Sequence, residues 1–517
     1  MKINERSHAP LDRIRWSQRL STVWSLVAGL RPHDFRAALT FIQTTNAKRP
    51  LLIRGWLFAG WTLSQMWVVL PRLRYQVKFA KPVATTPYWL ASGNPLANHP
   101  WSKDSLARLP ETVDTIVIGA GFTGASLAYF WSKHGKVNRE MLVLEMGDPA
   151  DGASGRNAGT VVMGRYYAMV QKSVLERLRK VRLDLTEDKR KQLADKFAAA
   201  YCRAAYRNAD LLEQIIRREG FDCDYQRNGW IQVRTSEEQE MLNESVRWAH
   251  DSGFDDWAKL TPAKVLEKSG LQVGADAGFS QRAGTFHPAK WVWSLLGAAV
   301  KLSNVKLFTR TKVLRIEDQG DHYAVYTDRG VIQARYVVNA TEAYTAALHR
   351  RFHDVIRPVQ SQAAAGRGFP PRLPSDVTVS GALWFGDRRG NDLLFGTDST
   401  PIPDSAANQN KPSRFLTKFA LGELQACTGP FAIEVTHEWS GAVGFTADQY
   451  PVIGLMDAKR QYLIGGMCGS GTAVSLNAAR CIVNRILEKT DEPDDYPPEY
   501  FAPSRLLDPA HHLWPIV

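Results

Sequence analysis

Asp114-Thr-Ile-Val-Ile-Gly119-Ala-Gly121-Phe-Thr-Gly124 is the stretch that decides the fold of this 517-residue chain. Its Ile-Val-Ile run is typical of a buried parallel strand. Gly119 allows a tight turn, Gly121 lets the backbone approach a diphosphate, and Gly124 lets a helix pack closely on the strand. A diphosphate would meet the free N–H groups at the helix N-terminus. The stretch therefore predicts the first βα unit of a dinucleotide-binding domain.

A second predicted strand, Met141–Leu144, ends in an acidic residue, Glu145. Glu145 lies 24 residues after Gly121, close to the roughly 20-residue spacing at which an acid accepts hydrogen bonds from a ribose. The three glycines alone would be weak evidence, with a purely structural role as the alternative. For the later glycines Gly469 and Gly471, the alternative is an ordinary tight strand-to-helix turn. With both strands and the acid in register, we expect an adenine dinucleotide as the ligand.

Further segments rich in small residues are expected over the same ligand. They are Gly152-Ala-Ser-Gly-Arg-Asn-Ala-Gly159, Trp439 to Gly454 and Leu463 to Thr472. Together with the glycine turn they resemble the D-amino-acid oxidase superfamily of FAD-dependent amine oxidoreductases. That superfamily includes glycine, sarcosine and gamma-glutamylputrescine oxidases and bacterial D-amino-acid dehydrogenases. The likeness runs from about Tyr88 to about Leu487.

The resemblance implies a mixed α/β fold, in which a Rossmann-like FAD-binding domain is interleaved with an antiparallel-sheet substrate domain. A helical N-terminal extension and a C-terminal tail would flank these domains. The expected limits are 1–110 for the extension, 111–170, 285–345 and 435–490 for the FAD-binding domain, 171–284 and 346–434 for the substrate domain, and 491–517 for the tail.

The resemblance also assigns the residues that hold FAD. They are Gly119, Gly121, Phe122, Thr123, Gly124, Glu145, Ala153, Ser154, Asn157, Ala158, Gly159, Val313, Thr341, Gly441, Asp448, Gly466, Gly469, Ser470, Gly471 and Thr472. Val313 would lie near the adenine and Thr341 beside the diphosphate. The turn from Gly469 to Thr472 would direct N–H groups at the flavin N1 and O2 atoms, where the reduced ring carries negative charge.

We expect the FAD to be bound noncovalently. Sarcosine oxidases link their flavin through a cysteine five positions before the Thr of a Thr-Pro-Asp motif, and the matching Thr446 puts Gly441 at that place. The histidine link of dimethylglycine dehydrogenases would fall around Arg156-Asn157, where no histidine stands. Cys468 is expected to be a small packing residue.

By resemblance, the reaction delivers the hydrogen on the substrate α-carbon to flavin N5, and the resulting imine is hydrolysed. The cofactor supplies the difficult step, so an acid–base pair of side chains is not required. No catalytic side chain is assigned, and the candidates are Arg156, His287 and Trp384. Each has a structural alternative as a solvated, capping or core residue.

The substrate is an amine or an amino acid. Arg388 and Arg389 are, with Arg156, candidates for a fork that binds a carboxylate, and His437-Glu438 are candidates to approach the pocket. Trp384-Phe385-Gly386 stands where a Tyr-Arg pair is expected in the D-amino-acid dehydrogenase-like strand. This departure leaves a bulkier or more apolar amine open.

The net charge of +13 is concentrated in the N-terminal extension. Residues 1–110 carry 16 Lys and Arg against four acids, whereas the remaining 407 residues carry 49 against 48. A nearly neutral core does not favour nucleic acid, including a tRNA-modifying role known in this superfamily. Five cysteines without a Cys-x-x-Cys pair, and the lack of His-Glu-x-x-His spacing, disfavour disulfides and a metal site.

Two stretches of the extension have a helical pattern, Arg13–Leu30 and Gly55–Leu70. Both are rich in tryptophan and flanked by basic residues, as in helices that lie in a membrane interface. The alternatives are a membrane span and a helical extension packed on the core or on a partner subunit through residues 1–80. A location at the cytoplasmic side of a membrane is expected, with a cytoplasmic soluble or mitochondrial protein as the alternative.

Three functions stay open at this point. The first is an FAD-dependent amine or amino-acid dehydrogenase at a membrane surface, which passes electrons to quinone or another carrier. The second is a soluble oxidase that uses O2 and produces hydrogen peroxide. The third is a flavoprotein retained as a docking or structural subunit of a larger membrane complex.

Overall fold

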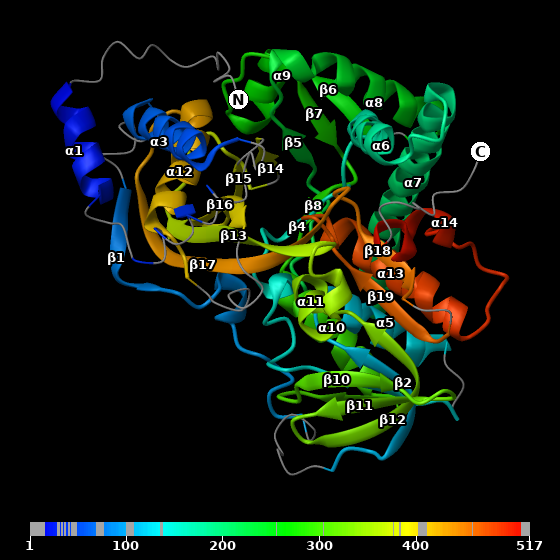
Figure 1. Cartoon of the computed structure of the whole chain (residues 1–517). Helices are drawn as coiled ribbons and strands as arrows, with labels where there is room; N and C mark the ends of the chain where they lie inside the picture. The colour runs from blue at the N-terminus through cyan, green and yellow to red at the C-terminus, as the bar shows by residue number, and fades with distance from the viewer. Residues whose placement is uncertain are drawn as a thin grey trace.

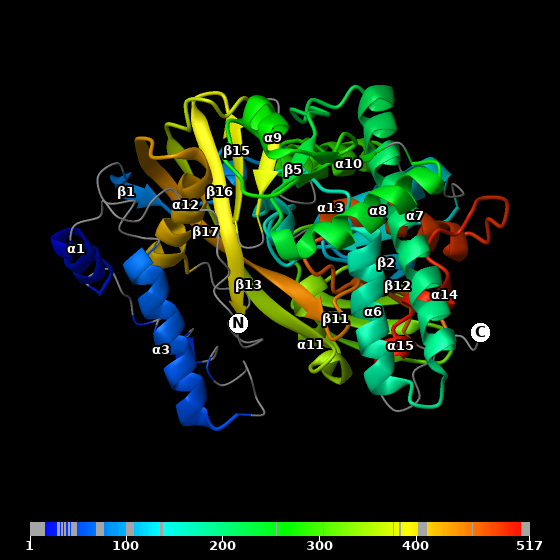
Figure 2. The same ribbon diagram turned by 90° about the horizontal axis from the view of Figure 1, so that it is seen from above.

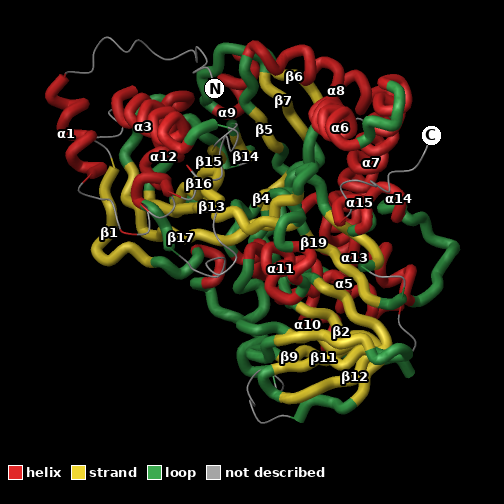
Figure 3. The backbone as a smooth tube through the Cα atoms, in the orientation of Figure 1, coloured by secondary structure: helices red, strands yellow, loops and turns green. Residues whose placement is uncertain are grey.

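The computed structural model describes residues 16–27, 49–68, 77–99, 108–134, 138–254, 256–302, 304–375, 377–381, 384–401, 411–456 and 459–507, with single positions between 32 and 42. They form two large sheets surrounded by helices (Figures 1 and 3). This arrangement confirms the predicted mixed α/β fold. The predicted polar insertion at 404–412 lies largely outside the described residues.

The first sheet has eight strands and carries the glycine turn. The strands are β10 (Val313–Asp318), β11 (Tyr323–Thr327), β12 (Gly330–Asn339), β2 (Thr112–Ile118), β3 (Met141–Leu144) and β9 (Val305–Phe308), with β19 (Gln461–Gly465) beside β12 and β18 (Val452–Leu455) beside β19. β12, β2, β3 and β9 run parallel, so their carboxyl ends meet at one edge. This is the Rossmann-like sheet expected from the glycine turn.

Both faces of this sheet are covered, which explains its unbroken apolar strands. Val117 packs in one hydrophobic cluster, and its neighbours Ile116 and Ile118 pack in another on the opposite side. The first cluster includes side chains of α5 (Phe122–His134), α10 (Pro288–Val300) and α13 (Gly471–Ile486), which pack on one another. A strand buried on both sides has no polar face to alternate with.

The second sheet has nine strands and is largely antiparallel. Its order is β1 (Val77–Ala84), β17 (Ile433–Thr446), β13 (Ile356–Arg367), β16 (Asp392–Pro401), β15 (Trp384–Arg389), β14 (Thr378–Ser380), β5 (Trp230–Gln232), β7 (Ala277–Ser280) and β6 (Trp257–Leu260). α12 (Arg414–Thr428) packs on β15 and β16. The small β4 (Thr160–Val161) and β8 (Gly284–Thr285) pair separately, between the two large sheets (Figure 1).

Four helices lie beside the β5–β7–β6 end of the nine-stranded sheet: α6 (Tyr167–Val181), α7 (Glu187–Glu219), α8 (Gln239–Asp251) and α9 (Pro262–Ser269) (Figure 2). α8 and α9 contact β6, whereas α7 packs on α6 and α13. α6 and α7 are separate helices, joined at residues 182–186. Thr186 starts the second one, because its side chain accepts a hydrogen bond from Lys189 N. Gly220 ends it in the left-handed conformation, with φ of 65°.

The N-terminal extension is only partly helical. α1 (Trp16–Val27) and α3 (Leu51–Val68) match the two predicted helical stretches. Residues 77–84, however, form the edge strand β1, which pairs parallel with β17, and η3 (Tyr88–Leu90) packs into the core. The extension that stands apart from the two sheets therefore ends well before residue 110. Within the described part of the chain, no helix is long and apolar enough to cross a membrane.

The C-terminal segment packs on the protein as far as residue 507. It contains α14 (Pro498–Phe501) and α15 (Ser504–Leu507), and Tyr496 and Phe501 are completely buried. The remaining short helix, α11 (Thr345–Leu348), follows β12. The expected tail is thus, in its described part, an element of the core, while the predicted domain limits stay a prediction.

Candidate active site

The glycine turn has the close contacts that its three glycines predict. Gly119 has φ of +106°, and a Cβ there would lie 2.6 Å from the carbonyl oxygen of Ala340. A Cβ at Gly121 would lie 2.7 Å from Ser154 Oγ, and one at Gly124 would collide with the carbonyl oxygen of Gly119. Only glycine therefore allows β2, α5 and the end of β12 to come together at this point.

Glu145 closes the same turn from the neighbouring strand. Its carboxylate accepts hydrogen bonds of 2.8 Å from the N–H of Ala120 and of 2.8 Å from the N–H of Gly147. Burial raises the pKa of this carboxyl, although the two N–H donors oppose the shift. The carboxylate is thus held beside the glycine turn, at the position where the sequence predicts a ribose-binding acid.

The loop from Gly152 to Gly159 lies against the start of α5. Ser154 Oγ accepts a hydrogen bond of 2.8 Å from the N–H of Phe122, and the Asn157 side chain is bonded to the backbone of its own loop. Trp89 covers the loop: its indole N–H donates 2.8 Å to the carbonyl oxygen of Asn157. A side chain at Gly159 would collide with this indole ring.

A buried carboxylate joins three further loops at the edge of the sheet. Glu342, two residues after Ala340, has φ of 49°, and it accepts hydrogen bonds from the N–H groups of Gly466 (3.2 Å) and Met467 (3.0 Å). Burial raises its pKa to about 7, against the effect of the N–H groups of Met467, Gly444 and Gly466. Glu342 thus links the end of β12 to β17 and to the segment that follows β19.

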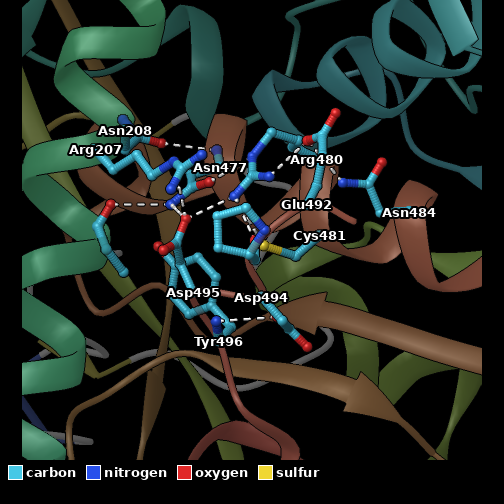
Figure 4. A network of polar contacts seen from close by, with 12 residues as sticks. Arg207, Asn208, Asn477, Arg480, Cys481, Asn484, Glu492, Asp494, Asp495 and Tyr496 are labelled. Carbon is cyan, nitrogen blue, oxygen red and sulfur yellow. Dashed lines mark hydrogen bonds and ion pairs between the residues drawn. The ribbon is translucent and has the colours of Figure 1, made fainter. Parts of the chain in front are cut away.

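The segment that carries Gly466 and Met467 leads into the N-terminus of α13. A polar network connects α13 to α7 and to the residues that follow α13 (Figure 4). Asn208 of α7 donates to the carbonyl oxygen of Thr472 (2.7 Å) and accepts from the N–H of Asn477 (3.0 Å). Arg480 donates to Glu492 (2.9 Å) and to Asp495 (2.6 Å). Because these contacts are buried or partly buried, the position of the first turn of α13 is well defined.

Thr472 also ties α13 to the small-residue loop. Its hydroxyl accepts a hydrogen bond of 3.2 Å from the N–H of Val162, just after Gly159. Gly469 has φ of +84°, which favours glycine, and Ser470 and Gly471 follow it into the helix. The two glycine-rich segments predicted for FAD are therefore joined at one place, although they lie some three hundred residues apart.

Cys468 and Gly441 have no side chain free to attach a flavin. The Cys468 thiol donates to the carbonyl oxygen of Gly466 (3.2 Å) and accepts from the N–H of Thr446 (3.3 Å). Burial raises the pKa of this thiol to about 12, so the thiolate is disfavoured. A Cβ at Gly441 would lie 3.1 Å from the Cβ of Arg156.

Each of the three candidate arginines is engaged within the chain. Arg156 donates to Asp151 and to the carbonyl oxygen of Ser440. Arg388 donates to the carbonyl oxygens of Gly390 and Leu373 and stacks on Phe369. Arg389 forms an ion pair with Asp387 and donates 3.1 Å to the carbonyl oxygen of Gly159. Arg156 belongs to the predicted FAD loop, and Arg389 contacts it from β15.

His287 and Trp384 lie in structural positions. His287 caps α10, since its Nδ1 accepts a hydrogen bond of 3.1 Å from the N–H of Lys290, and burial lowers its pKa to about 4. Trp384 packs in the cluster under α12, whereas the next residue, Phe385, packs against the main core. Their catalytic assignment remains a prediction, with the contacts favouring the structural alternative.

His437 and Glu438 lie on β17 and face different groups. His437 packs edge-on against Tyr88, with ring centroids 5.8 Å apart, and burial lowers its pKa. Glu438 pairs with Arg414 of α12 at 3.1 Å. The predicted ion pair at the strand is thus formed by Glu438, with α12 as its partner.

Two residues that are predicted to bind FAD, Asp448 and Val313, pack against or bond to other residues of the protein. Asp448 accepts from both sides of the Arg505 guanidinium, at 2.7 and 3.1 Å, and from the hydroxyl of Thr446. Val313 is buried at the start of β10, in the cluster that also contains Leu144 beside Glu145. Both lie on elements that support the site, and their contact with FAD remains a prediction.

Comparison with known proteins agrees with this geometry. Residues 114–485 match the model of the DAO family, FAD dependent oxidoreductases. The probable oxidoreductase OrdL of Haemophilus influenzae is 24% identical over 391 residues, which are 73% of this chain and 83% of that protein. The chain therefore belongs to the DAO family of FAD dependent oxidoreductases, and FAD is its cofactor.

Solved structures share the fold at low sequence identity. Glycine oxidase from Geobacillus kaustophilus superposes with a TM-score of 0.61 at 21% identity, over 76% of this chain and 99% of that one. L-proline dehydrogenase from P. horikoshii gives 0.60 at 17% identity, over 78% and 98%. These likenesses confirm the two-sheet architecture.

The residues of the site fit the cofactor. The turn at Gly119, Gly121 and Gly124 has no room for side chains, Glu145 is held beside that turn, and α13 begins beside the Gly152–Gly159 loop. In the part of the chain that the structure describes, no group of three or more His, Cys, Asp or Glu could hold a metal ion.

Sequence reasoning missed Trp89, Glu342 and the pairing of Asp387 with Arg389. Glu342 carried a usable signal, because it stands just past the carboxyl end of a predicted parallel strand, where functional side chains gather. The Asp387–Arg389 ion pair also carried a usable signal, because residues two apart in a strand share a face. Nothing in the local sequence indicates that Trp89 covers a loop 68 residues away.

Proposed function

We propose that this protein uses noncovalently bound FAD to oxidise the C–N bond of a small amine, and that the electrons pass to a quinone or another carrier. The observation that carries the proposal is the convergence of the glycine turn, the Gly152–Gly159 loop and the first turn of α13 in a chain of the DAO family. When it is bound, FAD accepts the hydrogen that leaves the substrate carbon.

The residues of the chain would position the reacting groups. Glu145 and the glycine turn would hold the nucleotide end of FAD, while the N–H groups at the start of α13 would face the end of the ring that gains negative charge. The buried network behind α13 keeps that helix in place. Orientation of this kind lowers the barrier without an acid–base pair.

The contacts of the three arginines favour an amine over a simple amino acid. A substrate carboxylate needs a guanidinium with free donors, yet Arg156 and Arg388 donate to the chain. Arg389 donates to the Gly159 carbonyl of the cofactor loop, but Asp387 already neutralises its charge. Arg156 and Arg389 are each paired with an acid, which makes these two guanidinium groups less available to a substrate carboxylate.

The experiment is reduction of the purified yellow protein under anaerobic conditions. Amines should bleach the flavin absorbance, while the corresponding amino acids should do so much more slowly. Acid precipitation should release FAD into the supernatant, as expected for noncovalent binding. Bleaching by amino acids alone would contradict the proposed substrate class, and a flavin that no amine or amino acid reduces would instead favour a docking subunit.

An oxidase is the second candidate, since the chain shares its fold with a glycine oxidase. Hydrogen peroxide is measured in air with an amine that reduces the flavin, and its amount distinguishes the dehydrogenase from the oxidase. Turnover that needs an added quinone or dye supports the proposal, and stoichiometric peroxide without any added acceptor supports the oxidase.

A further inference from the structure

We infer that α1 and α3 form a docking surface for an anionic lipid bilayer, which the protein contacts without spanning it. The docking surface consists of Trp16, Leu20 and Trp24 on α1 and Leu52, Trp56 and Leu63 on α3. It lies outside the FAD site, and lipid binding needs no turnover, so this inference stands or falls separately from the proposed reaction.

α3 has one face on the protein and one face bare. On the inner side, Trp61 packs against Phe419 of α12, with ring centroids 6.1 Å apart. On the outer side, Leu52 is 82% exposed, Trp56 is 79% exposed and Leu63 is also exposed. Residues at this spacing share one side of a helix, so the side turned away from the core is apolar.

α1 continues the pattern. Trp16, Leu20 and Trp24 follow one another at intervals of four, and all three are exposed. The helix is held to α3 by Trp16, whose ring meets that of Trp67 edge-on at 4.9 Å, and by Arg19, whose guanidinium lies 5.4 Å from the same ring. Exposed tryptophans and leucines on two helices that contact each other indicate a contact surface.

Both helices lie at the end of the molecule that carries α12, away from the eight-stranded sheet (Figures 1 and 2). A flat surface could therefore approach them without meeting the FAD-binding domain. Because Trp61 holds α3 against α12, only the outer half of α3 is available to lipid. A helix with an exposed apolar side and one side against the protein is suited to lie in a membrane interface.

The positive charge of the sequence around α3 indicates an anionic partner for the docking surface. Between residues 35 and 103 the sequence contains nine Lys and Arg and no Asp or Glu. Arg49 stands just before α3, and Lys78 and Lys81 are exposed on β1. Tryptophan beside lysine and arginine is the composition of segments bound to anionic lipid headgroups, whereas the centres of protein–protein interfaces are depleted of lysine.

The test is flotation of the full-length holoprotein with vesicles. It should float with vesicles of equal parts phosphatidylcholine and phosphatidylglycerol, bind phosphatidylcholine alone more weakly, and dissociate in high salt. The double variant Leu52→Glu/Trp56→Glu should bind at least ~10-fold more weakly. Leu183→Glu is the matched control, because Leu183 is 77% exposed at a site remote from α1 and α3, and it should bind like the unchanged protein.

A second variant guards against a failure of the first to fold. Arg49→Glu/Lys78→Glu changes only charge, and it should lose the preference for the anionic vesicles while the flavin absorbance stays the same. No binding of the unchanged protein to either vesicle, or equal binding by the Leu52→Glu/Trp56→Glu variant, would overturn the inference. Self-association that this variant abolishes, without vesicle binding, would assign the surface to contact between copies of the chain instead.

Discussion

The backbone N–H of Met467 donates a hydrogen bond of 3.0 Å to the carboxylate of Glu342, and both groups lie at the edge where the parallel strands end. Met467 belongs to the segment that leads into α13, and Glu342 follows β12. The bond therefore joins two of the segments that form the candidate site. Its acceptor is a buried acid whose pKa is raised to about 7.

Glu342 should make the stability of the protein depend on pH. Its pKa in the folded chain lies above the ordinary value of 4.5. The stability that it contributes is therefore complete below about pH 4.5 and is lost as the pH rises through about 7, a loss of at most about 3 kcal/mol. Glu342→Gln cannot ionise, so urea unfolding should show a smaller fall in stability over this range.

The control for Glu342 is Glu434→Gln, on the exposed side of β17. It should keep the pH dependence of the unchanged protein. Equal slopes for all three proteins would show that Glu342 ionises as freely in the folded chain as in the unfolded one.

Gly124→Ala should disrupt the cofactor site. The new methyl group would collide with the carbonyl oxygen of Gly119, so α5 must move away from β2. We expect a loss of roughly 3 kcal/mol in the free energy of unfolding and little bound FAD, measured as flavin absorbance per protein.

Gly297→Ala is the matched control, since it also lies in a helix of the same layer. A Cβ there would meet a single atom, at 4.0 Å. Alanine should be neutral or slightly stabilising at this position. Full flavin content in Gly124→Ala would mean that the helix can shift without harm to the site.

Asp387 and Arg389 should behave as a coupled pair. Asp387 is completely buried, and burial raises its pKa to about 6 even beside Arg389. Arg389→Met leaves this acid without its partner and should cost about 3–5 kcal/mol. The double variant Asp387→Asn/Arg389→Met should recover part of that loss in chemical denaturation.

The same variants separate a structural from a substrate-binding arginine. If Arg389 also binds a substrate carboxylate, Arg389→Met should raise the KM for amino acids selectively, in addition to lowering stability. The proposed amine substrate predicts lower stability alone, with no selective effect on amino acids.

Arg505 should be essential for the packing of the C-terminal segment. Its guanidinium and the Asp448 carboxylate are both almost completely buried, and they make two hydrogen bonds. Arg505→Met and Asp448→Asn should each lower the free energy of unfolding by about 3 kcal/mol, and the double variant by less than their sum. If Asp448→Asn instead lowers flavin content at unchanged stability, Asp448 contacts the cofactor as the sequence suggested.

The sequence predicted the elements whose signals are local. The glycine turn, the strand before it and the acid after β3 depend on residues close together in the chain, and the structure has them where expected. The two helices of the extension and the pair α6 and α7 also followed from their apolar spacing. Family resemblance, rather than periodicity, linked these elements to the remote segments near the C-terminus.

What sequence reasoning missed depends on contacts between distant residues. β1 contains Lys78, Lys81 and Pro82, and it becomes a strand because β17, more than 340 residues later, supplies its partner. Arg156 looked available for a substrate until Asp151 and Ser440 proved to occupy its donors. Trp384 was chosen over Phe385 by residue type, whereas the pleat of β15 decides which of them faces the main core.

Trp89 has a consequence for where the folded enzyme begins. The match to the family starts at residue 114, yet this indole ring fills the space over Gly159 and is bonded to Asn157. A protein shortened to residue 114 would open an indole-sized hole above the flavin loop and admit water to it. Removal of α1 and α3 alone would leave that seal intact. Trp89 is therefore part of the packed core of the protein, although it stands upstream of the recognised family domain.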